Sequence, residues 1–301
     1  MFPLVLVFLS LSTSLSVSFA QSGGVSFFVL GDWGREGKDS QTVVANSMGK
    51  RGDLSKPQFV ISTGDNFYQK GVQSVTDSQW VTSFERIYSA GSLQIPWYAV
   101  LGNHDYLTNP EAEIAYTFTG HRWKMPARYF AQEIKVDANT TALFLFLDTS
   151  PFILDYQAQD AKFHVKSEST SRQLLWMDSV LSHSKAKWKF AVGHHPLYSA
   201  ASTHGNTPEL LSQVLPLFQR NNVQAYFCGH DHNLQHLIDD GIHYFVSGGG
   251  SRAREDIGKR ADAVFTANST GFLEVALTST ILVATFYDQS GKLLDTSRVQ
   301  P

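Results

Sequence analysis

Cysteine is nearly absent from this sequence. Cys228 is the only cysteine among 301 residues, so the chain cannot form an internal disulfide. A chain of this length with 43% hydrophobic residues can bury a large core, and it does not depend on disulfides for stability. Cys228 ends an apolar run, and we expect it to pack as a small hydrophobic side chain.

An excess of charge of either sign is also absent. The 24 Lys and Arg residues nearly balance the 27 Asp and Glu residues, which gives a net charge of −3. Long runs of like charge and low-complexity tracts are missing as well. Binding to nucleic acid or to an anionic membrane surface depends on a concentrated basic surface. We therefore expect no nucleic-acid partner and no membrane partner.

Long apolar runs are confined to the start of the chain. Residues 1–20 contain no charged side chain. Within them, Leu4–Leu9 resembles the hydrophobic region of a signal peptide, and Ser18-Phe19-Ala20 resembles a cleavage site. An uncleaved membrane anchor is the alternative, but the apolar core is short and diluted by serine. We predict a signal peptide over residues 1–20 and a single domain over residues 21–301.

Two glycosylation sequons accompany the predicted signal peptide. They begin at Asn139 (Asn-Thr-Thr) and at Asn268 (Asn-Ser-Thr). Such triplets also arise by chance, but both suit a chain that leaves the cytoplasm. We predict N-glycans at both asparagines and a protein of the secretory pathway, with an extracellular, vacuolar or lysosomal destination.

The apolar pattern predicts strands that alternate with helices. The expected strands are Val25–Leu30, Phe59–Ile61, Pro96–Leu101, Leu143–Leu147, Trp188–Val192, Gln224–Cys228, His243–Ser247, Gly271–Leu277 and Ile281–Tyr287. The expected helices cover about 40–50, 77–88, 172–181 and 207–220. Residues 149–170 are polar and irregular and predict an exposed loop or lid. Strands followed by helices imply largely parallel pairing, so we predict an α/β fold, a four-layer α-β-β-α sandwich of two mixed sheets.

The predicted strands end in residues that can bind metal ions. Loops at the carboxyl ends of parallel strands are where α/β proteins build their sites. Five such loops offer seven oxygen and nitrogen donors, which are Asp32, Asp65, Tyr68, Asn103, His194, His230 and His232. Seven donors are about what two adjacent metal ions need when one carboxylate bridges them. The phenol of Tyr68 is a hard, anionic ligand that suits a trivalent ion.

Single members of this set have ordinary structural explanations. A lone Gly-Asp pair after a strand is usually a turn or a helix cap. A lone histidine is more often a hydrogen-bonded core or surface residue than a ligand. We assign that structural role to the remaining isolated histidines, namely His121, His164, His183, His236 and His243. Chance alone rarely produces five strand ends that all offer metal ligands, so the metal-site interpretation rests on the whole set.

The five strand-end motifs resemble those of the calcineurin-like metallophosphoesterases. The motifs are Gly31-Asp32, Gly64-Asp65, Gly102-Asn103-His104-Asp105, Gly193-His194 and Gly229-His230-Asp231-His232. That superfamily usually has a histidine two residues after the first aspartate, where this chain has Gly34. Tyr68 is present instead, as in the purple acid phosphatases, and the length of the chain is similar to that of the small, tartrate-resistant type. The resemblance covers essentially the whole chain after residue 20.

The resemblance implies a ligand set and a metallophosphoesterase-like fold. Fe(III) would be bound by Asp32, Tyr68 and His232, and charge transfer from the phenolate would give a purple colour. A divalent Fe, Zn or Mn ion would be bound by Asn103, His194 and His230. Asp65 would bridge the two ions. Of the residues outside this set, His104 is the first candidate to face the substrate, and a protonated histidine suits an enzyme that works in acid. His204 is the second candidate. His195 replaces a tyrosine of the mammalian enzymes. It would either point into the pocket or pack against Tyr198, and we favour packing.

The implied activity is that of an acid phosphatase acting on phosphate monoesters. A metal-bound hydroxide would attack the phosphorus in line, and His104 and His204 would assist the leaving alkoxide. The expected substrates are small phosphate esters, with phosphoproteins as a further class. A metallophosphodiesterase or nucleotidase is the alternative within the superfamily, and iron-dependent peroxidation with release of reactive oxygen species is another. A non-catalytic binding protein is a third alternative, which the complete ligand set disfavours.

Overall fold

The computed structural model describes residues 24–254 and 257–301, so the predicted signal peptide lies outside it. The first of two seven-stranded sheets in these residues has the order β14 (Leu293–Val299), β13 (Leu282–Asp288), β12 (Gly271–Leu277), β1 (Val25–Leu30), β2 (Phe59–Ser62), β3 (Trp97–Ala99), β4 (Trp123–Lys124). The second has the order β11 (Ala263–Ala267), β9 (Leu234–Asp239), β10 (Ile242–Ser247), β8 (Ala225–Cys228), β7 (Trp188–Val192), β6 (Thr141–Phe146), β5 (Phe130–Lys135).

Both sheets are mixed, as the sequence predicts. Strands β1 to β4 pair in parallel, and β12 joins β1 antiparallel before β13 and β14 continue antiparallel. In the second sheet β6, β7, β8 and β10 pair in parallel, while β5, β9 and β11 are antiparallel additions. The parallel strands therefore end on the same side within each sheet, which brings their loops together. The sequence patterns did not predict β4, β5, β9, β11 or β14.

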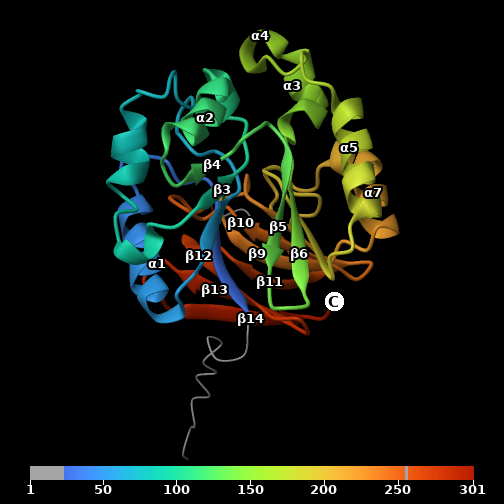
Figure 1. The fold of residues 1–301 in the computed structure, drawn as a ribbon. Helices are drawn as coiled ribbons and strands as arrows, with labels where there is room; N and C mark the ends of the chain where they lie inside the picture. Colours follow the sequence, from blue (N-terminus) through green and yellow to red (C-terminus); the bar gives the residue numbers. More distant parts are fainter. Residues whose placement is uncertain (1–23, 255–256) are drawn as a thin grey trace, which may run out of the picture.

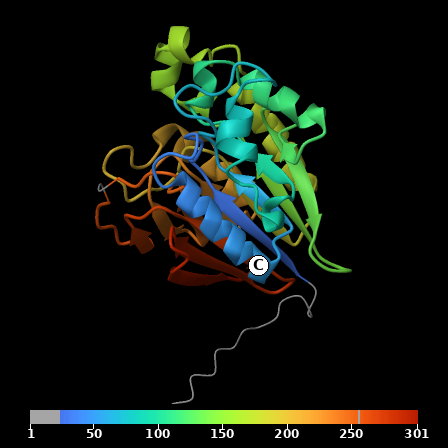
Figure 2. The same cartoon turned by 90° about the vertical axis from the view of Figure 1, so that its left-hand side faces the viewer.

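Helices cover the outer faces of the two sheets. They are α1 (Gln41–Ser55), α2 (Pro110–Tyr116), α3 (Leu154–Ala158), α4 (Asp160–Phe163), α5 (Thr170–His183), α6 (Pro208–Gln213) and α7 (Leu215–Arg220). Short turns add the π-helix η2 (Trp80–Glu85) and the 3₁₀ segments η3 (Gly91–Leu93), η4 (Asp105–Leu107), η5 (Thr117–Thr119) and η6 (Ser150–Phe152). Helices α1 and α2 lie to one side of the sheets and α5 and α7 to the other, so the predicted four layers are confirmed (Figure 1; Figure 2, turned by 90°).

Three predicted segments differ from the observed ones. The helix expected over 77–88 is the shorter η2. The helix expected over 207–220 is divided into α6 and α7, because Pro216 has no amide hydrogen and its ring would collide with the carbonyl group four residues earlier. The segment 149–170 contains η6, α3 and α4 rather than an irregular loop, because Phe152 and Phe163 bury their side chains in the core.

Aromatic side chains join the two sheets. Phe27 of β1 stacks on Phe59 of β2 at a centroid distance of 4.8 Å. It also meets Phe144 of β6 edge-on at 5.5 Å and Phe227 of β8 at 6.0 Å, and these two strands belong to the other sheet. Each such pair contributes about 0.5–1.5 kcal/mol beyond the burial of its surface. The central strands of both sheets are thus fixed relative to each other, and so are the loops that follow them.

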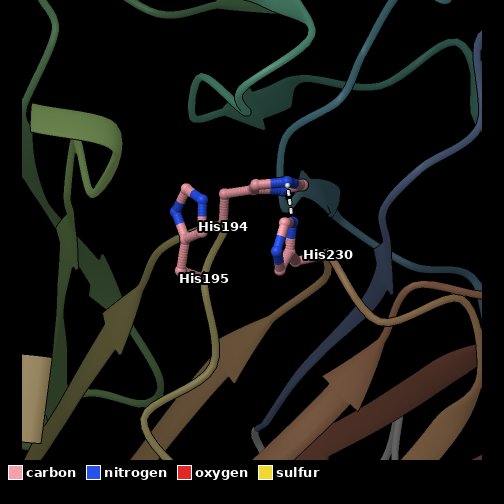
Figure 3. Close-up of side chains that lie close together, drawn as sticks. All are labelled: His194, His195 and His230. Atoms are coloured by element: carbon pink, nitrogen blue, oxygen red, sulfur yellow. Dashed lines mark hydrogen bonds between the residues drawn. The ribbon is translucent and has the colours of Figure 1, made fainter. Parts of the chain in front are cut away.

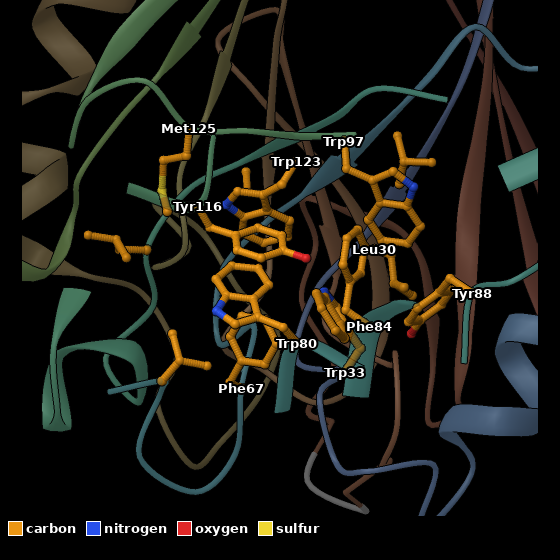
Figure 4. Packing of buried hydrophobic residues seen from close by; sticks show 14 of the residues in the cluster. Leu30, Trp33, Phe67, Trp80, Phe84, Tyr88, Trp97, Tyr116, Trp123 and Met125 are labelled. Carbon is orange, nitrogen blue, oxygen red and sulfur yellow. The ribbon is translucent and has the colours of Figure 1, made fainter. Parts of the chain in front are cut away.

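A second aromatic cluster lies between the first sheet and its helices (Figure 4). Trp33 packs edge-on against Phe67 at 5.5 Å and against Trp97 at 6.0 Å, and Trp80 stacks on Tyr116 at 3.5 Å. Trp33 directly follows Asp32, and Phe67 directly precedes Tyr68. The cluster therefore anchors two of the predicted ligand loops. Among the described residues, no helix combines the length and the apolar character needed to cross a lipid bilayer.

Candidate metal centre

Three of the predicted ligands meet around the phenol oxygen of Tyr68. The Tyr68 hydroxyl lies 3.0 Å from Asp32 Oδ1, at the end of β1, and 3.1 Å from His232 Nε2, in the loop after β8. Asp32 is fully buried, and His232 and Tyr68 are less than one-tenth exposed. Two oxygens and one imidazole nitrogen thus converge on one small volume, from loops far apart in the sequence.

Three other predicted ligands form a second group. His194 Nε2, after β7, lies 3.2 Å from Asn103 Oδ1, after β3, and 3.2 Å from His230 Nδ1 (Figure 3). His194 Nδ1 faces the carbonyl oxygen of Thr63 at 2.9 Å, so Nδ1 carries the hydrogen and Nε2 offers a lone pair. An imidazole lone pair and an amide oxygen that face each other suit a shared divalent cation.

Asp65 lies between the two groups. Its Oδ2 is 2.8 Å from the Tyr68 hydroxyl, while its Oδ1 is 3.5 Å from His194 Nε2. The amide of His104 donates to Oδ1 at 2.8 Å and fixes the carboxylate plane. Each oxygen of this carboxylate therefore faces one group of donors, which is the arrangement that a bridging ligand requires. All seven residues predicted as metal ligands thus lie in one cluster.

The loops reach these positions through unusual backbone geometry. Asp32, Asp65 and His230 have positive φ angles of 62°, 49° and 69°, a region that residues other than glycine rarely adopt. Strained conformations of this kind persist where the surrounding structure enforces them, and they gather at functional sites. The glycine before each loop is needed for space as well. A Cβ at Gly229 would lie 2.4 Å from Asp32 Oδ2.

Gly34 stands where the superfamily has a histidine, and the structure leaves no room for a side chain there. A Cβ at Gly34 would lie 1.9 Å from the carbonyl oxygen of Asn66. The loops after β1 and β2 touch at this point, because the amide of Tyr68 donates to the Gly34 carbonyl oxygen at 2.7 Å. The close contact excludes an imidazole at position 34 and places the phenol of Tyr68 against Asp32.

The charges in the cluster are unbalanced without cations. Burial, followed by the neighbouring charge of Asp65, raises the pKa of Asp32 well above its usual value. Burial also lowers the pKa of His230 and, together with the charge of Arg254, lowers that of His232 to about 3. The imidazoles of His230 and His232 therefore do little to neutralise the buried carboxylates. Bound metal cations would do so, and the donor set fits them.

A buried polar network supports the Asp65–Tyr68 loop, and no local sequence pattern predicts it. Asp105 accepts hydrogen bonds from the amides of Asn66, Phe67 and Gly102 at 2.8–3.1 Å. The Asn66 side chain also donates to Glu113 of α2 at 2.9 Å. Burial, then the charge of Asp105, raises the pKa of Glu113. No sequence pattern indicates this buried role of Glu113, because a glutamate in a helix normally faces solvent.

The two histidines predicted to assist the reaction lie beside the donor cluster. His104 Nδ1 is 2.7 Å from the carbonyl oxygen of Gln69, and its side chain is 33% exposed. His204 Nδ1 is 2.9 Å from Asp231 Oδ1, and its ring centroid is 4.1 Å from that of His230. Both imidazoles are therefore fixed through Nδ1 next to the proposed ligands while part of each ring stays accessible.

The prediction that His195 packs against Tyr198 is wrong. His195 Nδ1 lies 2.8 Å from the Thr149 hydroxyl, and its Nε2 lies 3.3 Å from the hydroxyl of Tyr156 in α3. Tyr198 instead donates to Asp239 at 2.8 Å. His195 points toward His194 and His230 (Figure 3), but hydrogen bonds already engage both of its nitrogens. Its position connects the segment 149–170 to the edge of the cluster.

Comparisons with known proteins agree with this architecture. A family model described as calcineurin-like phosphoesterase matches residues 25–234. Purple acid phosphatase 4 of Arabidopsis thaliana is 40% identical over 293 residues, which cover 92% of this chain and 85% of that protein. Tartrate-resistant acid phosphatase type 5 of Homo sapiens is 31% identical over 307 residues, which cover 94% of this chain and 93% of that protein.

A solved structure with the same fold has a different described role. The structure of GAP50, the anchor in the inner membrane complex of Plasmodium, has a TM-score of 0.81 at 24% identity and covers 92% of this chain and 89% of its own. That likeness shows the fold alone.

The family model and the two phosphatase relatives confirm the resemblance seen in the strand-end motifs. The chain belongs to the calcineurin-like phosphoesterase family and, within it, to the purple acid phosphatases.

Proposed function

We propose that this protein is an acid phosphatase that hydrolyses phosphate monoesters at a binuclear Fe(III)–M(II) centre, where M is Fe, Zn or Mn. Membership of the purple acid phosphatases implies a binuclear, iron-containing centre and small phosphate-ester substrates. The observation that carries the proposal is the position of Asp65 between the Tyr68 group and the His194 group. Phosphoproteins are a further proposed substrate class.

The chemistry of the donors distributes them between the two ions. Asp32, Tyr68 and His232 would hold Fe(III), because a carboxylate and a phenolate supply the hard anionic oxygens that a trivalent ion prefers. The neutral amide of Asn103 and the imidazoles of His194 and His230 would hold the divalent ion, and Asp65 would bridge. When bound, such a pair supplies Lewis acidity at the phosphoryl oxygens and lowers the pKa of water.

His104 is the proposed proton donor to the leaving alkoxide. Its amide is tied to Asp65 Oδ1 at 2.8 Å, and its Nδ1 must carry a hydrogen because it faces the Gln69 carbonyl oxygen. The side chain can then present only Nε2 to a bound ester, and the protonated ring donates from that atom. A proton delivered in this way prevents an unstable alkoxide from leaving, an effect of about 10²–10⁴-fold in rate.

His204 is the second proposed substrate-facing residue. Asp231 orients its ring through Nδ1, which leaves Nε2 for a phosphoryl oxygen or the leaving group. Asp231 is itself buried and receives a hydrogen bond from the Ser199 hydroxyl, so the carboxylate has a fixed position. Two histidines that approach from different loops can orient the ester without a pocket for one particular alcohol.

A comparison of monoester and diester substrates tests the proposed activity. The purified protein should hydrolyse p-nitrophenyl phosphate with an acidic optimum and should hydrolyse bis-p-nitrophenyl phosphate far more slowly. Removal of metals with a chelator should abolish the activity, and Fe together with a divalent ion should restore it. Preferential diester hydrolysis would favour the phosphodiesterase alternative. Peroxidation without phosphatase activity would contradict the proposal.

The same proposal places the protein in the secretory pathway, as an extracellular, vacuolar or lysosomal enzyme. Residues 1–20 would be removed as a signal peptide, and residues 21–301 would form one metallophosphoesterase domain. Asn139, in the turn between β5 and β6, and Asn268, after β11, are exposed and accessible to glycosylation. Amino-terminal sequencing should give Gln21, and glycosidase treatment should shift the wild type but not an Asn139→Gln/Asn268→Gln double variant.

A further inference from the structure

Arg35 lies against the aromatic ring of Tyr68. Its guanidinium carbon is 3.6 Å from the ring centroid, which is within the range of a cation–π contact. Only 10% of the Arg35 side chain is exposed. The ring of His104 also packs on Tyr68, with centroids 4.5 Å apart. A cation thus lies in van der Waals contact with the only phenol among the proposed ligands.

Hydrogen bonds fix Arg35 in this position. Its Nε donates to the hydroxyl of Ser251 at 2.9 Å, and that hydroxyl donates to the carbonyl oxygen of Asp32 at 2.5 Å. The backbone amide of Arg35 donates to Gln41 Oε1 at 2.9 Å. Ser251 therefore holds the guanidinium next to Asp32, and Gln41 holds the backbone of Arg35, so the folded loop fixes the guanidinium on the ring.

The positive charge of Arg35 is only partly neutralised. Asp39 Oδ2 is 3.7 Å from Arg35 Nε but only 2.7 Å from Arg252 Nε. One carboxylate thus serves two guanidinium groups and lies closer to the other one. Because both side chains are largely buried, the remaining charge on Arg35 acts on the Tyr68 ring through a low effective dielectric.

We infer that Arg35 is a positioning residue that orients Tyr68 and stabilises the negative charge of its phenolate, and thereby limits electron donation from the phenolate to the bound ferric ion. The inference rests on the proposed Fe(III) centre. Light absorption in a phenolate–Fe(III) pair moves an electron from the ring to the metal, so the ring loses the charge that the guanidinium stabilises. Arg35 therefore raises the energy of that transition and shifts the visible band to shorter wavelength.

The visible spectrum of charge-changing variants tests this inference. Arg35→Gln should shift the band to longer wavelength and should lower the Fe(III)/Fe(II) reduction potential, because electron donation increases. Arg35→Lys should keep the band close to its wild-type position, since the positive charge is retained. The matched control is Arg51→Gln. Arg51 also lies over a tyrosine ring, that of Tyr287 at 5.0 Å, but Tyr287 is not a proposed ligand, so the band should not change.

The outcomes separate this inference from the proposed function. Circular dichroism first shows that each variant is folded, and iron content shows that each is loaded. A coloured wild type with the same band in Arg35→Gln overturns the role of Arg35 and leaves the iron centre intact. A shift of equal size in Arg35→Lys or in Arg51→Gln also overturns it, because charge on the Tyr68 ring would not be the cause. A wild type without a visible band overturns both proposals.

Discussion

The amide of Tyr68 donates a 2.7 Å hydrogen bond to the carbonyl oxygen of Gly34, so the two positions that distinguish this chain from most of its superfamily are in direct contact. The bond joins the loop after β1 to the loop after β2. It also closes the space above Gly34, where the Asn66 carbonyl oxygen would lie 1.9 Å from any Cβ. The missing imidazole and the added phenol are therefore one structural feature.

Replacing Gly34 should separate the two loops. Gly34→Ala forces a methyl group into the Asn66 carbonyl oxygen, and we expect a loss of about 2–3 kcal/mol in the free energy of unfolding. Chemical denaturation measures the loss. Gly91→Ala is the matched control, because nothing lies within 4 Å of a Cβ at that position, and it should change stability by less than about 0.5 kcal/mol. Equal stabilities for the two variants would contradict the close contact.

The two histidines proposed to face the substrate should differ from surface histidines in their effect on catalysis. His104→Asn should lower kcat by about 10²–10⁴-fold in acid, because the leaving alkoxide loses its proton donor. His204→Asn should lower kcat by a smaller factor. Metal content should remain at the wild-type level in both variants. His121→Asn serves as the control, because His121 is half-exposed and stacks on Tyr116. Wild-type kcat in both His104→Asn and His204→Asn would remove these residues from the mechanism.

A histidine pair with one fully buried member, His236, should reduce stability in acid. His236 Nδ1 lies 2.8 Å from the Ser297 hydroxyl, and its Nε2 lies 2.9 Å from His243 Nδ1. Burial, and then the charge of His243, lowers the pKa of His236 from 6.5 to about 3 in the folded protein. Below pH 6.5 the unfolded chain therefore binds a proton that the folded chain does not. The free energy of unfolding should fall from pH 6.5 toward pH 3, with a loss of about 2 kcal/mol by pH 5.

Denaturation at several pH values, with His236→Gln beside the wild type, measures this effect. The glutamine keeps an amide near Ser297 and His243 but does not itself titrate, so the stability of the variant should fall less between pH 7 and pH 5. His183→Gln, at the exposed end of α5, is the control and should keep the wild-type acid dependence. An acid loss that is equal in His236→Gln and the wild type would show that the pair does not cause it.

The strand ends explain why much of the site could be predicted. Glycine followed by Asp, Asn or His after an apolar strand is a local pattern, and parallel strands bring such patterns together. No comparable sequence pattern marks Arg35 or Glu113. Arg35 acts through its contact with Tyr68 and Glu113 through its contact with Asn66, and no local pattern encodes either contact. The edge strands were missed for the same reason. β14, for example, has only exposed and half-buried residues before Val299, without a regular alternation, and its place depends on pairing with β13.

The visible spectrum of the purified protein, measured with its iron content before and after Tyr68→Phe, tests the central claim most directly. We predict a stoichiometric amount of iron and a visible charge-transfer band in the wild type. Tyr68→Phe removes only the phenol oxygen from the contacts with Asp32, Asp65 and His232, so the folded variant should lose the band. A colourless, iron-free wild type with full phosphatase activity, or a band that survives Tyr68→Phe, would contradict the account.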